Sequence, residues 1–187
     1  LMNLVGVFRL ATGVLLDYAK GNKHQHELNL LHKLRDQFKV GDLVLADRGF
    51  SSYTLLALLL SRGAHSLFRL HQRRPADLRQ GKRLGKNDRL LVWPKPGQKP
   101  AWLPQSWWKK IPDELSVRVL RFQLARRGFR PKSVTLVTTL LEAVALVLGE
   151  AAWRPVRLRR VATARAVKRG DVLERDEDVT VQLDVGD

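Results

Sequence analysis

A short apolar run is the sequence feature that most restricts how this chain folds. Residues 43–46 read Leu-Val-Leu-Ala without a polar interruption, and Asp47, Arg48 and Gly49 follow directly. Uninterrupted apolar runs of this length are typical of strands that are buried on both faces of a parallel sheet. The chain emerges at the carboxyl end of such a strand, so we expect Asp47 to lie where it meets solvent or a metal ion.

Strand and helix patterns alternate around this run and predict an α/β fold. The expected strands are residues 4–10, 13–18, 43–46 and 66–70, and the expected helices are residues 24–38 and 53–61. The first two strands form a hairpin, Ser51 and Ser52 cap the second helix, and Gly63 ends it. We expect the strand at 43–46 to be central in the sheet and parallel to the strand at 66–70.

The middle of the chain, residues 71–114, has a different composition. It holds six of the eight prolines and four of the five tryptophans, with one clear strand pattern at residues 88–93. Prolines at this density favour turns and edge strands, so we expect a β-rich insertion. Strands at 117–124 and 133–140, joined by a turn around Gly128, then return to the sheet. The predicted organisation is 1–70 and 115–146 as the core, 71–114 as the insertion, and 147–187 as a tail.

The tail does not show a pattern that predicts a packed element. Residues 153–169 are dense in Arg, Ala and Val, and seven acidic residues against a single Arg follow Gly170. The stretch 179–183 has a weak strand pattern, but the acidic composition equally fits disorder. We therefore expect 147–187 to be aberrant or disordered, and we assign no packing role to it.

The net charge points to a polyanionic partner. The chain carries a formal net charge of +16, and residues 62–132 hold 19 basic side chains against 4 acidic ones. Arginine predominates there, and its planar guanidinium suits phosphate, although a solvated basic surface is the alternative. Trp93 and Trp102 fit either stacking on unpaired bases or a small core for the insertion. The predicted DNA-binding residues are Arg48, Arg69, Arg73, Arg74, Arg79, Lys82, Arg83, Lys86, Arg118, Arg121, Arg126, Arg127 and Arg130.

The composition also excludes several classes of site. The chain has no cysteine, which rules out disulfides, thiolate metal sites and cysteine nucleophiles and suits the reducing cytoplasm. No apolar run approaches the roughly 20 residues needed to cross a bilayer, and residues 1–8 read as a strand rather than a secretion signal. No Gly-rich phosphate loop, nucleophile elbow or zinc cluster occurs. We expect a cytoplasmic protein.

Asp47 is the strongest candidate for chemistry, but the sequence shows no clear partner for it. Divalent ions in phosphoryl transfer are held by carboxylates from separate elements, whereas Asp36 belongs on a polar helix face and Asp42 on a turn. His24 and His26 point about 200° apart on a helix, so only His24 and Glu27 have a spacing that lets them share an ion. Asp47 equally fits a structural role, as a helix cap or as the ion-pair partner of Arg48.

The ordered motifs resemble a known enzyme family. The segment Gly41-Asp-Leu-Val-Leu-Ala-Asp-Arg-Gly-Phe-Ser51, followed by Gly63 and Leu67-Phe-Arg-Leu70, resembles the catalytic domain of DDE-class insertion-sequence transposases, with the insertion-sequence-four family as the nearest relatives. The resemblance covers about residues 3–146. It implies a ribonuclease-H-like mixed sheet with flanking helices and a β-rich insertion, and it places Asp47 on the second catalytic Asp. The implied chemistry is DNA transposition by phosphoryl transfer, with two Mg²⁺ ions held by three carboxylates.

The resemblance also implies that two of the three carboxylates are missing. The family's first Asp lies on an internal strand that would precede residue 1, and its final Glu follows the equivalent of Leu141 in a pattern that this chain does not show. Glu142 and Glu150 do not stand in the family's context. We therefore expect an incomplete sheet with an open edge, and a transposase fragment truncated at both ends, with a reading-frame shift near residue 146.

Two functional hypotheses follow from this resemblance. In the first, the chain is a transposase fragment that holds Mg²⁺ weakly through Asp47 and is inactive alone. In the second, it is a noncatalytic DNA-binding protein or a regulator of an intact transposase. The expected partners are DNA and either an intact transposase or a second copy of the chain.

Overall fold

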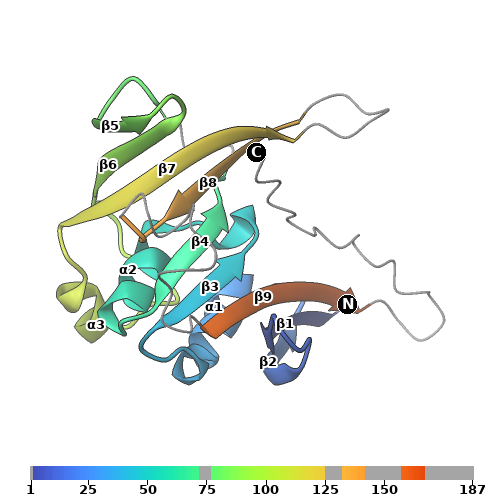
Figure 1. Cartoon of the computed structure of the whole chain (residues 1–187). Helices are drawn as coiled ribbons and strands as arrows, with labels where there is room; N and C mark the ends of the chain where they lie inside the picture. Colours follow the sequence, from blue (N-terminus) through green and yellow to red (C-terminus); the bar gives the residue numbers. More distant parts are fainter. Residues whose placement is uncertain (1, 72–76, 125–131, 142–156, 167–187) are drawn as a thin grey trace.

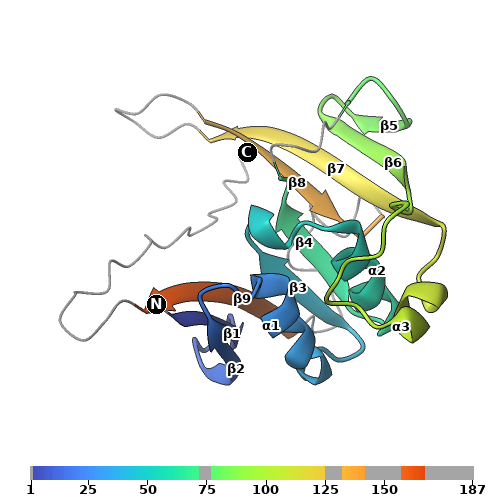
Figure 2. The same ribbon diagram turned by 180° about the vertical axis from the view of Figure 1, so that it is seen from behind.

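The described residues form a mixed α/β structure around one nine-stranded sheet, whose arrangement is shown in Figures 1 and 2. The computed structural model describes residues 2–71, 77–124, 132–141 and 157–166. In the described part the strand order is β2-β1-β9-β3-β4-β8-β7-β6-β5. The strands are β1 (Met2–Arg9), β2 (Leu15–Asn22), β3 (Asp42–Ala46), β4 (His65–Arg69), β5 (Lys82–Gly85), β6 (Asp88–Pro94), β7 (Glu114–Leu124), β8 (Lys132–Thr138) and β9 (Arg157–Ala166).

The predicted hairpin at the start of the chain is confirmed, whereas the first helix is shorter than expected. Strands β1 and β2 pair antiparallel. The side chain of Asn22 then accepts hydrogen bonds from the backbone amides of His24 and Gln25 and holds them in a turn. Helix α1 (Glu27–Lys33) begins only after His26, whose Nδ1 accepts from the amide of Leu28 at 3.2 Å. A short 3-10 helix, η1 (Arg35–Gln37), follows it.

The central βαβ unit matches the sequence prediction closely. Strand β3 pairs parallel to β4. A 3-10 helix, η2 (Arg48–Phe50), and helix α2 (Tyr53–Ser61) connect the two strands. The hydroxyl of Ser52 caps α2 by accepting from the amide of Leu55 at 3.2 Å. Gly63 follows the helix with a φ of 71°, in the left-handed region that glycine enters without strain.

The insertion extends the same sheet and also contributes a helix. Strands β5 and β6 form an antiparallel pair, and β6 continues onto β7, which pairs with β8. Strand β8 pairs antiparallel with β4. Helix α3 (Gln105–Lys110) lies between β6 and β7 in the chain, so the insertion is not purely β-structured. The turn expected around Gly128 lies outside the described residues.

The tail departs most from its sequence prediction. Residues 157–166 form β9, which lies inside the sheet, antiparallel to β1 and parallel to β3. The expectation that 147–187 has no packing role therefore fails at these residues, and the place beside β1 that we expected to be open is filled. The pattern at 179–183 lies outside the described residues.

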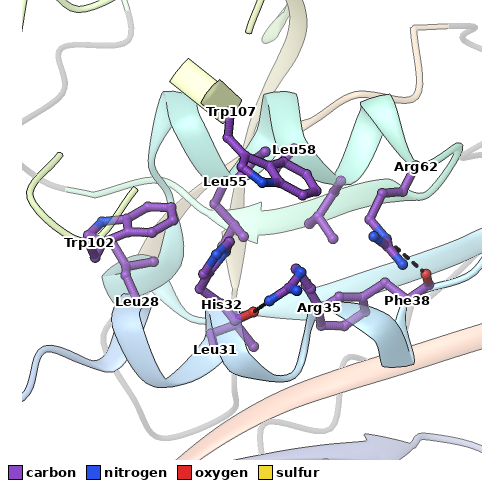
Figure 3. Close-up of a pocket in the computed structure, with 11 residues that line it drawn as sticks. Leu28, Leu31, His32, Arg35, Phe38, Leu55, Leu58, Arg62, Trp102 and Trp107 are labelled. Atoms are coloured by element: carbon purple, nitrogen blue, oxygen red, sulfur yellow. Dashed lines mark hydrogen bonds between the residues drawn. The ribbon is translucent and has the colours of Figure 1, made fainter. Parts of the chain in front are cut away.

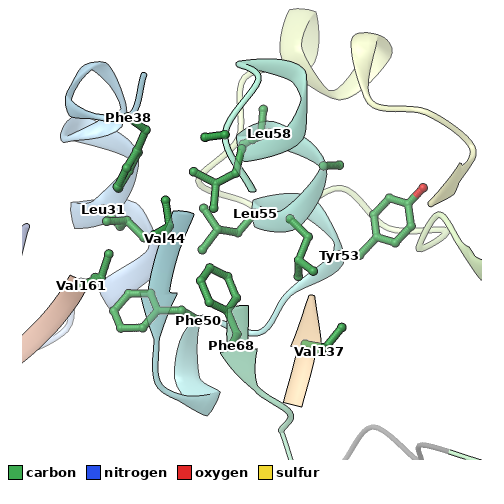
Figure 4. Close-up of a cluster of buried hydrophobic side chains, with 14 of the residues drawn as sticks. Leu31, Phe38, Val44, Phe50, Tyr53, Leu55, Leu58, Phe68, Val137 and Val161 are labelled. Atoms are coloured by element: carbon green, nitrogen blue, oxygen red, sulfur yellow. The ribbon is translucent and has the colours of Figure 1, made fainter. Parts of the chain in front are cut away.

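The core lies between the sheet and the helices α1 and α2, which pack on the same face (Figures 1, 2 and 4). Val44, Phe68 and Val161 project from three neighbouring strands toward this layer, where Leu31 of α1 and Leu55 of α2 meet them. Phe50 of η2 is also buried among these side chains. The same apolar layer therefore fixes both β3 and the turn that carries Asp47.

Truncation of Phe50 should test whether the turn that carries Asp47 is packed into the core. Phe50 is 2% exposed, so Phe50→Ala leaves a cavity and should lower the free energy of unfolding by about 3–5 kcal/mol. Tyr18 is 53% exposed, and Tyr18→Ala should change this free energy by less than about 1 kcal/mol. Urea unfolding followed by circular dichroism measures both. Equal losses for the two variants would contradict the packing.

Candidate functional site

Asp47 lies at the carboxyl end of β3, in an extended conformation, as the last residue before η2. Its carbonyl accepts from the amide of Phe50 at 3.0 Å, which closes the turn. Its side chain is exposed, and within the described residues it neither caps η2 nor pairs with Arg48. The two structural roles considered for this carboxylate are therefore absent from the described part of the chain, and the side chain is available to a ligand.

The other aspartates of the first 70 residues lie away from Asp47. Asp17 is on β2, three strand spacings from β3, or about 14 Å, and it accepts from Gln37 at 3.0 Å. Asp42 is buried at the opposite end of β3, about 16 Å along the strand, and it accepts from the amide of Lys39. Asp36 pairs with Arg62 at 3.1 Å. None of these carboxylates shares the turn with Asp47.

Glu27 is the acidic residue that the structure brings toward this turn. A methyl group placed on Gly49 of η2 would lie 3.6 Å from Oε2 of Glu27. From the sequence alone, Glu27 stood out only as a possible partner of His24, because the predicted helix began at residue 24 and not at Glu27. Since α1 begins at Glu27, this side chain projects from the first helical turn. No group of three His, Cys, Asp or Glu side chains gathers anywhere in residues 2–71, 77–124, 132–141 and 157–166.

Exposed cations line the same end of the sheet as Asp47. Arg69 is the last residue of β4. Because Ala46 pairs with Phe68, Arg69 lies level with Asp47, which follows β3. The pairing continues across β8 and β7 to Asp88, whose hairpin turn carries Lys86. Arg121 of β7 lies one residue further along and donates to the hydroxyl of Thr135 at 3.3 Å. We call Arg48, Arg69, Lys86 and Arg121 the basic edge.

A comparison with protein families identifies the family to which the chain belongs. The family model described as the transposase DDE domain matches residues 1–143. The chain belongs to this transposase family. Members of the family act on DNA in transposition and generally use a divalent metal. No match is found among characterised proteins or among solved structures.

The described residues of this transposase domain do not fit a pair of Mg²⁺ ions. Mg²⁺ loses its water reluctantly and needs several hard oxygen ligands at near-octahedral positions. The turn after β3 offers the carboxylate of Asp47, with that of Glu27 near Gly49 and the cation of Arg48 beside it. Two carboxylates flanked by arginines are too few to hold two ions. We therefore derive no catalytic step through a metal at this edge.

The remaining predicted DNA-binding residues have different environments. Lys82 and Arg83 are exposed on β5, and Arg79 is exposed but pairs with Asp77 at 3.0 Å. Arg118 is only 2% exposed, and its Nε donates to both carboxylate oxygens of Asp88 at 2.9 and 3.1 Å. The structure thus places Arg118 in a cross-strand ion pair and gives it no surface for DNA. The other predicted positions, Arg73, Arg74, Arg126, Arg127 and Arg130, lie outside the described residues.

The tryptophans of the insertion pack against the core. Trp102 and Trp107 lie with their ring centroids 5.5 and 6.1 Å from that of His32, above a small apolar hollow between α1 and α2 (Figure 3). Arg35 stacks over Trp107 at 5.8 Å, and burial together with the Arg35 charge lowers the pKa of His32. These rings hold the insertion on the helical layer, which favours the core interpretation over base stacking.

In the described part of the chain, no helix is long and apolar enough to cross a membrane.

Removal of Asp88 should show that Arg118 serves stability. Asp88→Asn leaves the buried guanidinium without its anionic partner and should lower the free energy of unfolding by roughly 3 kcal/mol. Asp113 offers a matched control, because its carboxylate is 96% exposed and only 3.5 Å from Lys95. Asp113→Asn should change the free energy by less than about 0.5 kcal/mol. Urea unfolding measures both, and an Asp88→Asn chain as stable as the control would contradict this role.

Proposed function

We propose that this chain is a DNA-binding fragment of a transposase that does not cleave DNA by itself. Its core is a ribonuclease-H-like sheet, and Asp47 is the surviving member of the catalytic carboxylates. The observation that carries the proposal is the composition of the basic edge, where, among the described residues, the exposed Asp47 is accompanied by Arg48 and Arg69 instead of by a carboxylate set. Such an edge attracts phosphate, but in the described part of the chain it does not offer the ligands for two metal ions.

The strand order supports the ribonuclease-H-like part of the proposal. In the described sheet, antiparallel β2 and β1 precede β9, and parallel β3 and β4 follow it, with α2 crossing between them. The family resemblance implies this type of mixed sheet, with the second Asp after a central parallel strand. Asp47 follows β3 directly, which supports its assignment to this second Asp.

The basic edge favours duplex DNA as the ligand. Exposed guanidinium groups form two parallel hydrogen bonds to a phosphate, and each contact releases condensed counterions. Arg48 and Arg69 follow neighbouring parallel strands, while Arg121 and Lys86 extend the positive charge across β7 to the turn before β6. The cations therefore form a row across the sheet rather than a single point, as contact with a phosphate backbone requires.

Salt-dependent binding tests the DNA surface. The chain should bind a short duplex of arbitrary sequence, and the double substitution Arg48→Ala with Arg69→Ala should weaken binding. If each arginine contacts one phosphate, the slope of log affinity against log salt should become shallower by about 1.8. Fluorescence anisotropy over a sodium chloride series measures the slope.

Two cations on α3 provide the matched control. Lys109 and Lys110 are exposed on α3. Helix α3 lies at the end of the sheet opposite the basic edge (Figure 1). Substitution of both by alanine removes the same charge and should leave the slope nearly unchanged. Equal effects of the two double variants would show that net charge, and not the basic edge, binds the DNA.

A nicking assay tests the absence of cleavage. Supercoiled plasmid incubated with the full chain and either Mg²⁺ or Mn²⁺ should be nicked no faster than with the Asp47→Ala variant. Agarose electrophoresis resolves the relaxed product. Nicking by the wild-type chain that disappears in Asp47→Ala would establish catalysis and overturn this part of the proposal, whereas the DNA-binding result would stand.

The same surface supports a second candidate function, as a regulator of an intact transposase. A domain that binds DNA without a complete carboxylate set occupies its target and leaves it uncut. In a strand-transfer assay with an active transposase of the same family, the chain should then inhibit, and the Arg48→Ala with Arg69→Ala variant should inhibit less. Equal inhibition by both would point to contact between the proteins instead of competition for DNA.

A further inference from the structure

In the described sheet, β2 is the last strand at one end and pairs with β1 alone (Figures 1 and 2). The amide of Arg9 donates to the carbonyl of Val14, so the backbone groups of Arg9 face β2. Facing alternates along a strand, and Val5 therefore also faces β2, with its partner Ala19 facing β1. The next residue, Tyr18, consequently directs its amide and carbonyl away from β1, toward the outer edge of the sheet.

The side chain of Asp17 closes part of this outer edge. Its Oδ1 accepts from the amide of Tyr18 at 2.8 Å, and its Oδ2 accepts from Nε2 of Gln37 at 3.0 Å. Gln37 of η1 thus holds the carboxylate in place. The amide of Lys20, two residues further on, points in the same direction as that of Tyr18, and no described strand meets it there. The outer edge therefore carries one amide that is already bound beside one that is open.

The side chains around the outer edge favour pairing with another strand. Leu15 and Tyr18 of β2 are 47% and 53% exposed, and Val14, just before β2, is 54% exposed. Large apolar side chains beside an unpaired strand edge promote pairing with another chain, and proteins commonly block such edges with inward-pointing charged residues. Asp17 is a charged residue of this kind, because it points toward η1.

A second copy of β2 matches this edge in the antiparallel direction. When two copies meet about a two-fold axis at Ala19, Tyr18 of each copy lies opposite Lys20 of the other, and the two residues exchange backbone hydrogen bonds. This register also places each Tyr18 ring beside the ammonium group of Lys20 in the other copy, a favourable cross-strand pair. It requires the Tyr18 amide to donate to the opposite Lys20 carbonyl, and Asp17 occupies that amide.

We propose that β2 is a self-association edge for a second copy of this chain, and that Asp17 keeps it closed by holding the amide of Tyr18. The Oδ1 atom takes the place that the carbonyl oxygen of the incoming strand needs. Two oxygens cannot share one amide hydrogen in good geometry, and the negative carboxylate repels the approaching carbonyl dipole. The chain therefore stays monomeric as long as the hydrogen bond between Asp17 and Tyr18 is intact.

Hydrogen exchange of the unmodified chain tests the closed edge. The amides of Tyr18 and Lys20 both point outward, but only that of Tyr18 has an acceptor among the described residues. After correction for intrinsic rates, the Tyr18 amide should exchange at least about tenfold more slowly than the Lys20 amide. Two-dimensional NMR of the nitrogen-15-labelled chain resolves both. Equal protection of the two amides would overturn the proposal.

Three variants test what Asp17 prevents. Asp17→Ala removes the acceptor and should dimerise at concentrations at least about tenfold lower than the wild-type chain, because the Tyr18 amide of each copy gains a partner. Asp17→Asn keeps an acceptor oxygen at the same position and should behave like the wild type. Asp113→Ala removes a carboxylate that is 96% exposed and should also have no effect. Sedimentation velocity measures all three, in about 0.5 M sodium chloride to screen the net charge of +16.

The outcomes separate the hydrogen bond from charge and from folding. A folded Asp17→Ala chain that is as monomeric as the wild type would overturn the proposal, and so would equal dimerisation of all three variants. In the Asp17→Ala dimer the Lys20 amide should become protected, whereas a dimer that leaves it unprotected would place the interface elsewhere. If circular dichroism shows Asp17→Ala to be unfolded, Asp17→Val replaces it, because a β-branched side chain suits a strand and likewise offers no acceptor.

Discussion

The fold depends on the backbone of β3 finding a strand on each side. A short apolar strand buried under α1 and α2 leaves no water to satisfy its amides and carbonyls, so each of its edges needs a partner. Strand β4 satisfies one edge through the α2 crossover. The other edge is satisfied only by β9, from the far end of the described chain. The rest of the sheet extends outward from this arrangement.

The residues at the end of β3 meet the requirements for phosphate binding and those for metal-dependent cleavage to different degrees. The parallel ends of β3 and β4 bring Asp47, Arg48 and Arg69 to one level. Cations attract phosphate over a distance and need less geometric precision than a coordination sphere does, so a partial set is enough for the DNA binding that we propose. Metal-dependent cleavage needs several carboxylates within one coordination sphere. An edge with this composition therefore meets the weaker requirements for holding DNA more readily than the stricter requirements for cutting it.

Local signals in the sequence were sufficient for the elements that surround β3. The apolar run at 43–46 and the serine cap of α2 each act within a few residues, so the βαβ unit was predictable. The pair between Arg118 and Asp88 joins two strands 30 residues apart, and charge alone made Arg118 look like a DNA ligand. Strand β9 was missed because its arginines and alanines lack an apolar rhythm. Its position depends on the backbone edges of β1 and β3, which need a partner strand. No local sequence pattern shows this need.

The strand next to β3 also determines what can stand beside Asp47. Because β9 runs parallel to β3 with Arg160 opposite Leu45, the residues after Val161 pass the level at which β3 ends. The described β9 sequence carries no carboxylate, so it adds none to this edge. The groups that stand near Asp47 are consequently set by the strand that pairs with β3 as well as by the segment that contains Asp47.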